Sequence, residues 1–167
     1  MLFSQSGQSV QVQADAWFGA GGRLRIQKQL PDQQLTISDG KSVWVCNQKP
    51  NQVWRGSTQS WLKASWMPKG LVPLNGYVEE LEKNFELKMT SSSEANVTFS
   101  ATPKDQRLAY TLQFIISTVS WLPSKTLYVS DSARVNTSLS DVTINPEDAA
   151  RQFHFTIPKG ATVIPLN

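Results

Sequence analysis

The residue types that most often carry chemistry are sparse in this chain. Its 167 residues include one histidine, His154, and one cysteine, Cys46. A catalytic triad needs a nucleophile, a histidine and an acid close together, and the sequence nominates no partners for His154. A single cysteine makes no intrachain disulfide and no zinc site by itself. We therefore expect no catalytic residue, no metal site and no cofactor, and we interpret Cys46 as a small buried hydrophobe.

The acidic residues and the glycine-rich segment have structural explanations. Asp39, Asp131 and Asp141 stand in predicted turns, where Asp side chains bond the nearby backbone. GAGG at 19–22 lacks the spacing of a phosphate-binding loop, and no helix is predicted after it. No two acids stand out as a general acid and base. An enzyme is therefore the least favoured class of function.

Charge and hydropathy exclude two further classes of protein. The net charge of +3 comes from 16 basic and 13 acidic residues scattered along the chain. Nucleic-acid binding usually requires a clustered basic face, so we expect no nucleic-acid partner. No stretch approaches the roughly 18 apolar residues of a membrane-spanning helix, and residues 1–15 show no export signal. We expect a soluble chain, and the low charged content of 17% suits an exported β-rich protein.

Alternation of apolar and polar residues predicts that most of the chain forms strands. The deepest alternation, LAYTLQFII, places one set of side chains on a single face: Leu108, Tyr110, Leu112, Phe114 and Ile116. Similar but shorter patterns predict further strands at 9–18, 23–29, 95–101, 126–132, 135–144 and 152–158, with a strand pair within 50–66 and a helical turn at 145–151.

A hairpin is predicted around Asp39-Gly40, because this dipeptide favours a two-residue type I′ turn. That turn would place Leu35 opposite Trp44. Directly opposed residues share a face of the sheet. The side chains predicted on one face are then Leu35, Ile37, Trp44 and Cys46.

One amphipathic helix is predicted over 73–87, with Asn75 as its N-cap. Its apolar residues recur at helical spacing: Leu74, Val78, Leu81 and Phe85. A meander of about eight to ten strands usually curls into a barrel or half-open barrel. The helix would then cover an open face. We predict a mainly β (α+β) fold of one domain over residues 1–167, a curved antiparallel sheet forming an incomplete β-barrel with a helical lid.

The apolar faces allow two interpretations. They can form an ordinary core, or they can leave an apolar cavity for an acyl chain. Burying each acyl CH₂ group is worth about 0.8 kcal/mol, so such a cavity needs no catalytic group.

Three segments, taken in order, resemble the LolA-type family of periplasmic lipoprotein carriers. They are RLRIQKQLPDQQLTISDGKSVWVCNQKPNQV at 23–53, LVPLNGYVEELEKNFEL at 71–87 and SLSDVTINPEDAARQFHFTIPKGATVI at 138–164. The shared features are an arginine-bearing strand, a Pro-Asp turn, a Ser-Asp-Gly-Lys hairpin, a lid helix and an ending with Asn-Pro, Phe-x-Phe and Pro-x-Gly.

The resemblance implies a carrier that shelters acyl chains of lipoproteins or another lipid and transfers them to the outer membrane. Its partners would be an inner-membrane release complex and an outer-membrane receptor, its location the periplasm, and its state a monomer. The residues that it assigns to the acyl cavity are Leu24, Ile26, Leu35, Ile37, Trp44, Leu74, Val78, Leu81, Phe85 and Phe114.

The chain departs from this family in two places. It starts almost directly at a strand, so we expect it to lack the family's export signal and N-terminal helix. GAGG at 19–22 stands where the family usually has an Arg-Pro pair whose arginine holds the lid closed. Related folds also serve as envelope sensors. The alternative function is therefore a regulatory module of the same fold that binds another envelope protein.

Overall fold

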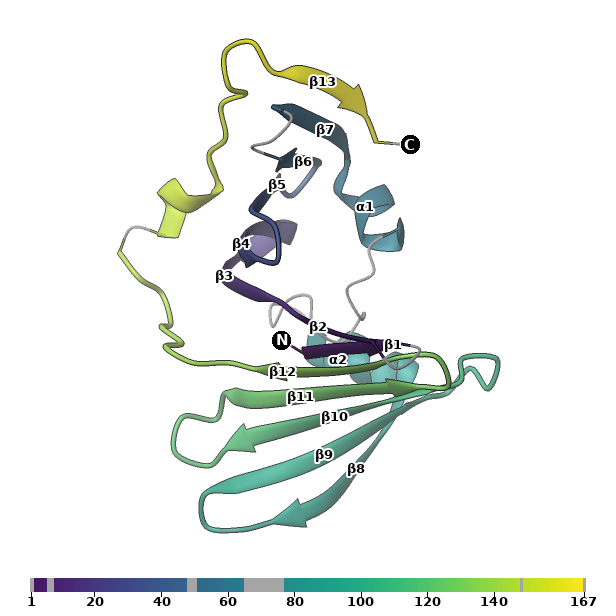
Figure 1. Cartoon of the computed structure of the whole chain (residues 1–167). Coiled ribbons are helices and arrows are strands. Elements are labelled where there is room, and N and C mark those ends of the chain that lie inside the picture. The colour runs from purple at the N-terminus through teal and green to yellow at the C-terminus, as the bar shows by residue number, and fades with distance from the viewer. Residues whose placement is uncertain (1, 6–7, 48–50, 65–76, 148, 167) are drawn as a thin grey trace. The chain divides into compact units, whose positions relative to one another are not determined.

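The computed structural model describes residues 2–5, 8–47, 51–64, 77–147 and 149–166. The chain divides into two compact units (Figure 1). Unit 1 contains Met1–Gln11 and Gly76–Val142, and unit 2 contains Val12–Asn75 and Thr143–Asn167. This division does not test whether residues 1–167 fold as one domain, which stays a prediction.

Unit 1 is a seven-stranded antiparallel sheet. Its strands, in spatial order, are β2 (Gln8–Gln11), β1 (Leu2–Gln5), β12 (Arg134–Ser138), β11 (Pro123–Ser130), β10 (Tyr110–Ser117), β9 (Asn96–Pro103) and β8 (Phe85–Ser92). Neighbouring strands from β8 to β12 follow one another along the chain, as expected for a meander. Helix α2 (Tyr77–Asn84) leads directly into β8 and packs against it.

The predicted helix extends too far at its C-terminal end. The described helix ends at Asn84, and Phe85 is the first residue of β8. The period of the apolar residues changes here from helical spacing to the alternation of Phe85, Leu87 and Met89, and β8 pairs with β9. Lys104 secures the end of the helix, since its backbone N–H donates to the Asn84 carbonyl at 2.9 Å. The start predicted at 73–76, with its Asn75 cap, lies outside the described residues.

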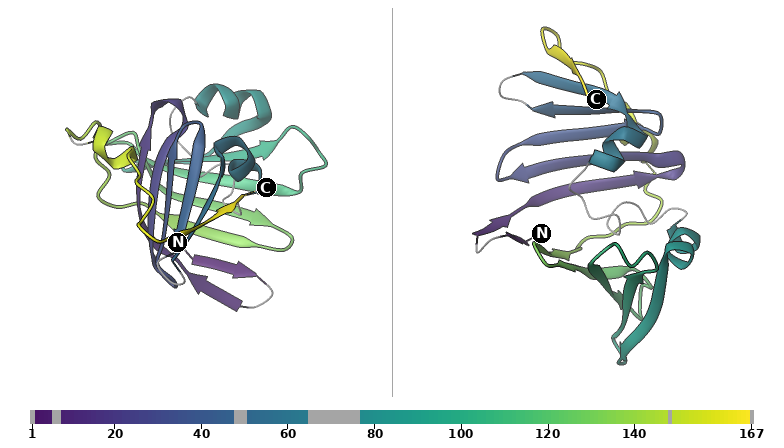
Figure 2. Two further views of the ribbon diagram at one scale, coloured as in Figure 1. Left: turned by 90° about the horizontal axis from the view of Figure 1, so that it is seen from above. Right: turned by 90° about the vertical axis from the view of Figure 1, so that its right-hand side faces the viewer.

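Unit 2 is a six-stranded sheet with parallel pairing only between its first two strands (Figure 2). In spatial order its strands are β13 (Thr162–Pro165), β7 (Gln52–Ser57), β6 (Ser42–Asn47), β5 (Gln34–Asp39), β4 (Arg23–Leu30) and β3 (Gln13–Gly19). Its helices are η1 (Ala20–Gly22), α1 (Thr58–Ala64) and η2 (Ala149–Phe153).

Several of the predicted strands differ in the structure, and the strand predicted at 135–144 ends at Ser138. The strand predicted at 9–18 is divided at Val12, with β2 in unit 1 and β3 in unit 2. The strand pair predicted within 50–66 is wrong, because β7 is followed by α1, whose first turn is capped by Ser57 accepting from the Ser60 N–H at 3.0 Å. The segment predicted as a strand at 152–158 is not one, since η2 ends at Phe153 and β13 begins only at Thr162.

The hairpin of β5 and β6 forms, but with a wider turn than predicted. Leu35 pairs with Cys46 and not with Trp44, a shift of two residues. Of the two turn residues, Gly40 has a positive φ of 98° and Asp39 does not, so the type I′ turn is wrong. The Asp39 carboxylate accepts the backbone N–H groups of Lys41 and Ser42 at 2.8 and 2.7 Å, which spreads the turn over four residues.

The mainly β fold class is confirmed. Neither sheet closes into a barrel within the part of the chain that the structure describes. The helices described here are short, and none of them is long and apolar enough to cross a membrane.

Candidate functional site

One face of the unit 1 sheet is mainly apolar, and the register also places the polar residues Ser130, Thr126 and Thr137 on it. Cross-strand partners share a face, so the pairs Leu87–Ala101, Ala101–Leu112 and Leu112–Tyr128 define one continuous row. A second row joins Met89, Phe99 and Phe114. We name this surface the aromatic face; its members are Phe85, Leu87, Met89, Val97, Phe99, Ala101, Tyr110, Leu112, Phe114, Ile116, Tyr128 and Val135.

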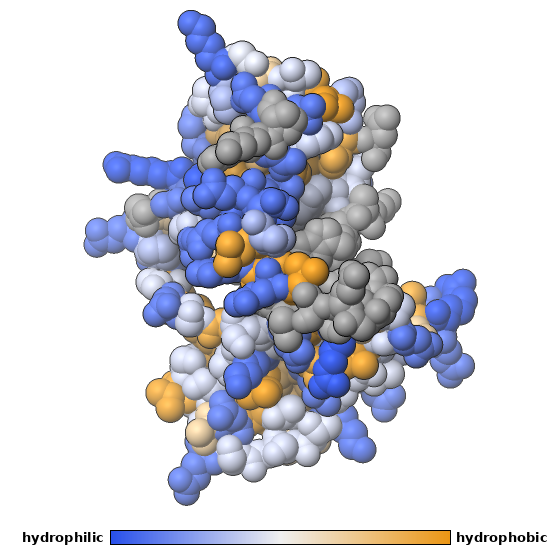
Figure 3. Space-filling model, in the orientation of Figure 1, coloured by the Kyte–Doolittle hydropathy of each residue, from blue (hydrophilic) through white to orange (hydrophobic). Residues whose placement is uncertain are grey.

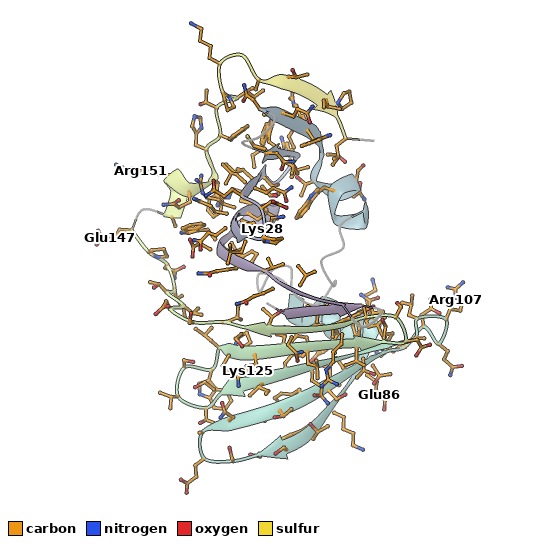
Figure 4. All side chains as sticks on the ribbon, in the orientation of Figure 1. Lys28, Glu86, Arg107, Lys125, Glu147 and Arg151 are labelled. Atoms are coloured by element: carbon orange, nitrogen blue, oxygen red, sulfur yellow. The ribbon has the colours of Figure 1, made fainter. Side chains whose placement is uncertain are left out.

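The opposite face of this sheet is mainly polar, although it also carries Ile115, Leu127 and Val129. Glu86, Lys88 and Lys125 are exposed there, together with several Ser and Thr residues (Glu86 and Lys125 are labelled in Figure 4). This alternation makes one surface suited to water and the other suited to an apolar partner.

The aromatic face is only partly buried. Leu112 and Val135 are nearly inaccessible, whereas Leu87 is 41% and Met89 58% exposed, and Phe99 and Phe114 are half-buried. The surface is therefore packed along β10 and β12 and open toward β8. In the view of Figure 3, hydrophobic side chains form small patches among hydrophilic ones.

An aromatic cluster lies on this face beside the helix. Phe85 and Tyr110 meet edge-on, with ring centroids 6.1 Å apart, and Tyr110 lies 5.2 Å from Tyr128. Burial, reinforced by Tyr128, raises the pKa of Tyr110 above its ordinary value. Leu81 of α2 is half-buried. The cluster fixes the start of β8, the strand that carries the exposed Met89.

Unit 2 has a sheet with two different packed faces. On the first, the pairs Leu24–Ser38 and Ser38–Val43 place the buried Leu24 and Val43 on the same face, one on either side of Ser38. The hydroxyl groups of Ser38 and Thr58 are hydrogen-bonded at 2.7 Å, which joins this face to the first residue of α1. We name this surface the valine face; it also carries Ile26 and Val45.

The second face of unit 2 carries arginine and tryptophan side chains. Arg25 lies 5.7 Å from the Trp17 ring and Arg55 lies 5.9 Å from the Trp44 ring. The C-terminal segment covers part of this face, since Phe155 lies 5.9 Å from Trp44. Ile37, in the same row, is 1% exposed. This face is a mixed core surface.

The ten predicted cavity residues do not form one surface. Leu24 and Ile26 lie on the valine face, whereas Leu35, Ile37 and Trp44 lie on the opposite face of the same sheet. The β4–β5 register places Leu24 opposite Ser38, so the odd-numbered residues of β5 share their face with Arg25 and not with Leu24. The five sheet residues therefore cannot line a single wall.

Of the other five predicted residues, four belong to unit 1 and Leu74 belongs to the segment of unit 2 that precedes it. Phe85 and Phe114 both lie on the aromatic face, and Leu81 is half-buried in α2. Val78 belongs to α2, but its side chain lies outside the described residues, as does Leu74 altogether. Whether any of the ten contacts a ligand stays a prediction.

Sequence reasoning missed the exposed part of the aromatic face. Leu87 was not predicted as a site residue because the predicted helix extended over residues 85–87. Met89, two residues further on, was assigned to no element. The alternation of Phe85, Leu87 and Met89 is visible in the sequence and could have identified β8. Phe99 also stands in a predicted strand, but only the register places it beside Phe114.

Two residues remain as chemical candidates, Cys46 and His154. Cys46 is 8% exposed, and its burial raises the pKa of the thiol, which confirms its interpretation as a packing residue. His154 is exposed. Within the described ranges, no three His, Cys, Asp or Glu side chains gather as potential metal ligands.

Comparison with known proteins identifies the family. The family described as "Outer membrane lipoprotein carrier protein LolA" matches residues 2–156. The chain belongs to the LolA family. An outer-membrane lipoprotein carrier protein of Dechloromonas aromatica is 29% identical over 143 residues, which cover 86% of this chain and 66% of that protein. One from Chromohalobacter salexigens is 24% identical over 164 residues, covering 98% of this chain and 76% of its own length.

A solved structure has a similar fold. The crystal structure of MucB has a TM-score of 0.52 and 17% identity, and the likeness covers 98% of this LolA-family chain and 57% of MucB. At this identity the comparison concerns the fold alone. The chain spans just under two thirds of the length of the D. aromatica relative and little more than half of MucB.

Proposed function

We propose that this LolA-family chain is a non-enzymatic carrier that shelters acyl chains of a lipoprotein or another lipid. The ligand would lie on the aromatic face of unit 1. The observation that carries the proposal is the exposure of Leu87 and Met89 on a sheet face whose paired rows carry no charged side chain. Family membership supports the same reading, since the curated relatives are named outer-membrane lipoprotein carriers.

The chemistry of this face suits reversible binding. Covering about six acyl CH₂ groups would contribute about 5 kcal/mol, before the losses of motion that accompany association. Met89 is flexible and polarisable, so it can adapt to chains of different shape. Because no bond is made or broken, a modest difference in affinity between carrier and acceptor is sufficient for transfer.

The remaining assignments are proposals that rest on the family. They comprise a periplasmic location, release from an inner-membrane complex and delivery to an outer-membrane receptor. Leu81 belongs to the proposed lid helix. Leu24 and Ile26 lie on the packed valine face of unit 2, where Leu24 is 1% exposed, so the proposed ligand surface is that of unit 1.

Substitution of Met89 tests the proposal. Met89→Asp places a charge on the exposed part of the aromatic face and should lower the affinity for a fluorescent fatty-acyl probe about tenfold, since a carboxylate is costly to cover with hydrocarbon. The melting temperature should change little, because Met89 is 58% exposed. The matched control is Ser100→Asp, which adds the same charge on the polar face of the adjacent strand and should leave probe binding unchanged.

Native mass spectrometry of protein purified from cells provides the second measurement. Co-purified acyl lipid that is retained by the wild type and Ser100→Asp but lost from Met89→Asp would support the carrier. A wild-type protein that carries no lipid and takes up no probe would refute it.

The second candidate is a regulatory module that binds another envelope protein. The observation that favours it is the edge strand β8, in which every residue after Phe85 is exposed. An open edge strand can pair with an extended segment of a partner. A photo-crosslinker at Lys88 distinguishes the two functions, because protein adducts in cells would favour the module and lipid-loaded protein without adducts would favour the carrier.

A further inference from the structure

The turn between β10 and β11 exposes two apolar side chains at its tip. Val119 is 89% and Trp121 71% exposed, the highest values among the large hydrophobic residues that the structure describes. Neither residue belongs to the aromatic face. Leu139 lies at the same end of the sheet, since its N–H donates to the Ser124 carbonyl at 2.8 Å, and it is 38% exposed. Scattered exposed hydrophobes are common, but a pair on one projecting turn needs an explanation.

The backbone N–H groups of this turn all form hydrogen bonds within the protein. Ser117 organises it, because its carbonyl accepts the Trp121 N–H at 2.8 Å and its hydroxyl accepts the N–H groups of Val119 and Ser120 at 3.3 and 3.4 Å. The other three donors are also used, in the bonds Ser117 N–H to Leu122 carbonyl at 3.0 Å, Thr118 N–H to Ala95 carbonyl at 3.0 Å and Leu122 N–H to Ser120 hydroxyl at 3.3 Å. Every backbone N–H from 117 to 122 therefore has a partner inside the protein.

The pairing of these N–H groups meets one requirement of a low-polarity environment. In water, an exposed turn can leave its N–H groups to the solvent, whereas within lipid each unpaired group is costly. The side chains obey the same rule, because the sequence STVSWLPS at 117–124 contains no charged residue. The nearest basic side chain along the strand is that of Lys125 on β11, labelled in Figure 4. The 117–124 segment itself carries no charge, and the acid beside it is Glu94 of the adjacent β8–β9 turn, whose carbonyl accepts the Thr118 hydroxyl.

The backbone at Trp121 adds a second observation. Its φ of 55° lies in the left-handed region, which a bulky residue seldom adopts. Such conformations persist where surrounding bonds hold them, and they concentrate at functional positions. Here the bond from the Trp121 N–H to Ser117 holds the turn, and the indole is left facing solvent.

We propose that the Val119–Trp121 turn is a membrane-docking tip that inserts into the interfacial layer of a lipid bilayer. Tryptophan favours this layer, because its ring is apolar and its N–H can reach the wet headgroup region. A protein pocket would not require that every N–H group of the turn be paired. The inference does not rest on acyl binding, since the tip and the aromatic face share no residue.

Vesicle partitioning of the full chain tests the tip. The protein is mixed with large unilamellar vesicles, either of phosphatidylcholine alone or of phosphatidylethanolamine with phosphatidylglycerol. Flotation then measures the fraction of protein that is bound to the vesicles. We expect the double variant Val119→Ser/Trp121→Ser to lower the partition coefficient at least about tenfold. The control Leu108→Ser changes a 45% exposed residue in the turn at the other end of β10, and should stay within about twofold of the wild type.

Three results would overturn the proposal. They are a wild type that does not float with vesicles at about 1 mM lipid, equal partitioning of the wild type and the double variant, and loss of binding when salt rises from about 0.05 to 0.5 M, which would indicate electrostatic docking elsewhere. Val119→Asp alone provides a second variant, because an 89% exposed side chain contributes little to folding. Met89→Asp should partition normally, so failure of the carrier proposal and failure of this one are separable.

Discussion

Gly40 occupies a position where any side chain meets the neighbouring turn. Its φ is +98°, and a Cβ built there would lie 2.2 Å from the carbonyl oxygen of Gly21. An L-residue in the left-handed region costs about 1–2 kcal/mol. A contact of 2.2 Å is more than an ångström too short, so the two turns must separate. Separation would strain two bonds of the Ser38 hydroxyl, those with the Gly40 N–H at 3.0 Å and the Gly22 carbonyl at 3.1 Å, worth about 1 kcal/mol each.

We therefore expect Gly40→Ala to lower the free energy of unfolding by about 3–4 kcal/mol. Gly160→Ala is the matched control. Gly160 has a similar φ of +80°, but nothing lies within 4 Å of its Cβ position. That variant should lose only the backbone contribution, about 1 kcal/mol. The difference between the two variants measures the close approach of the η1 turn to the β5–β6 turn.

Urea unfolding followed by far-UV circular dichroism measures both variants. Equal slopes of the unfolding free energy against urea are required for the comparison, because a changed slope would indicate an altered denatured state. If Gly40→Ala loses no more than Gly160→Ala, the packing of these two turns is not as described, and the argument fails.

Two further predictions concern the same end of unit 2. The Ser42 N–H, helped by that of Lys41, lowers the pKa of Asp39, so Asp39→Ala should cost about 1 kcal/mol at pH 7. This loss should disappear as the pH falls from 3.8 through the lower folded-state pKa, and a loss that persists in acid would contradict it. Ser38→Ala, at a fully buried site, should cost about 2 kcal/mol in urea unfolding, because the Thr58 hydroxyl loses its partner. The exposed Ser132→Ala is its control, and equal losses would refute the assignment.

The hairpin around Asp39 shows which structural features the local sequence pattern predicts correctly. The predicted register was wrong by two residues, yet Leu35, Ile37, Trp44 and Cys46 do share one face. A shift of two preserves the alternation, whereas a shift of one would have exchanged the faces. The turn itself was mispredicted, because the Asp39 carboxylate binds two N–H groups and widens the loop.

The candidate site was only partly accessible to sequence reasoning. Phe85 and Phe114 were both nominated, and the register places both on the aromatic face. Leu24 and Ile26 were grouped with Leu35, but pairing between β4 and β5 puts them on the other side of the sheet. No residue of either strand encodes that register locally, because it is set by partners distant in sequence.

The sequence by itself determined the β-rich class, the alternation of β10, the burial of Cys46 and the family, since each depends on residue type and local spacing. Only the tertiary structure decided that residues 9–18 divide between two sheets at Val12, that β13 joins β7 in parallel, and that Val119 and Trp121 project from a turn whose N–H groups are all paired. The physical reason is that strand pairing and exposure depend on contacts between segments far apart along the chain, and such contacts leave no periodic trace in the sequence.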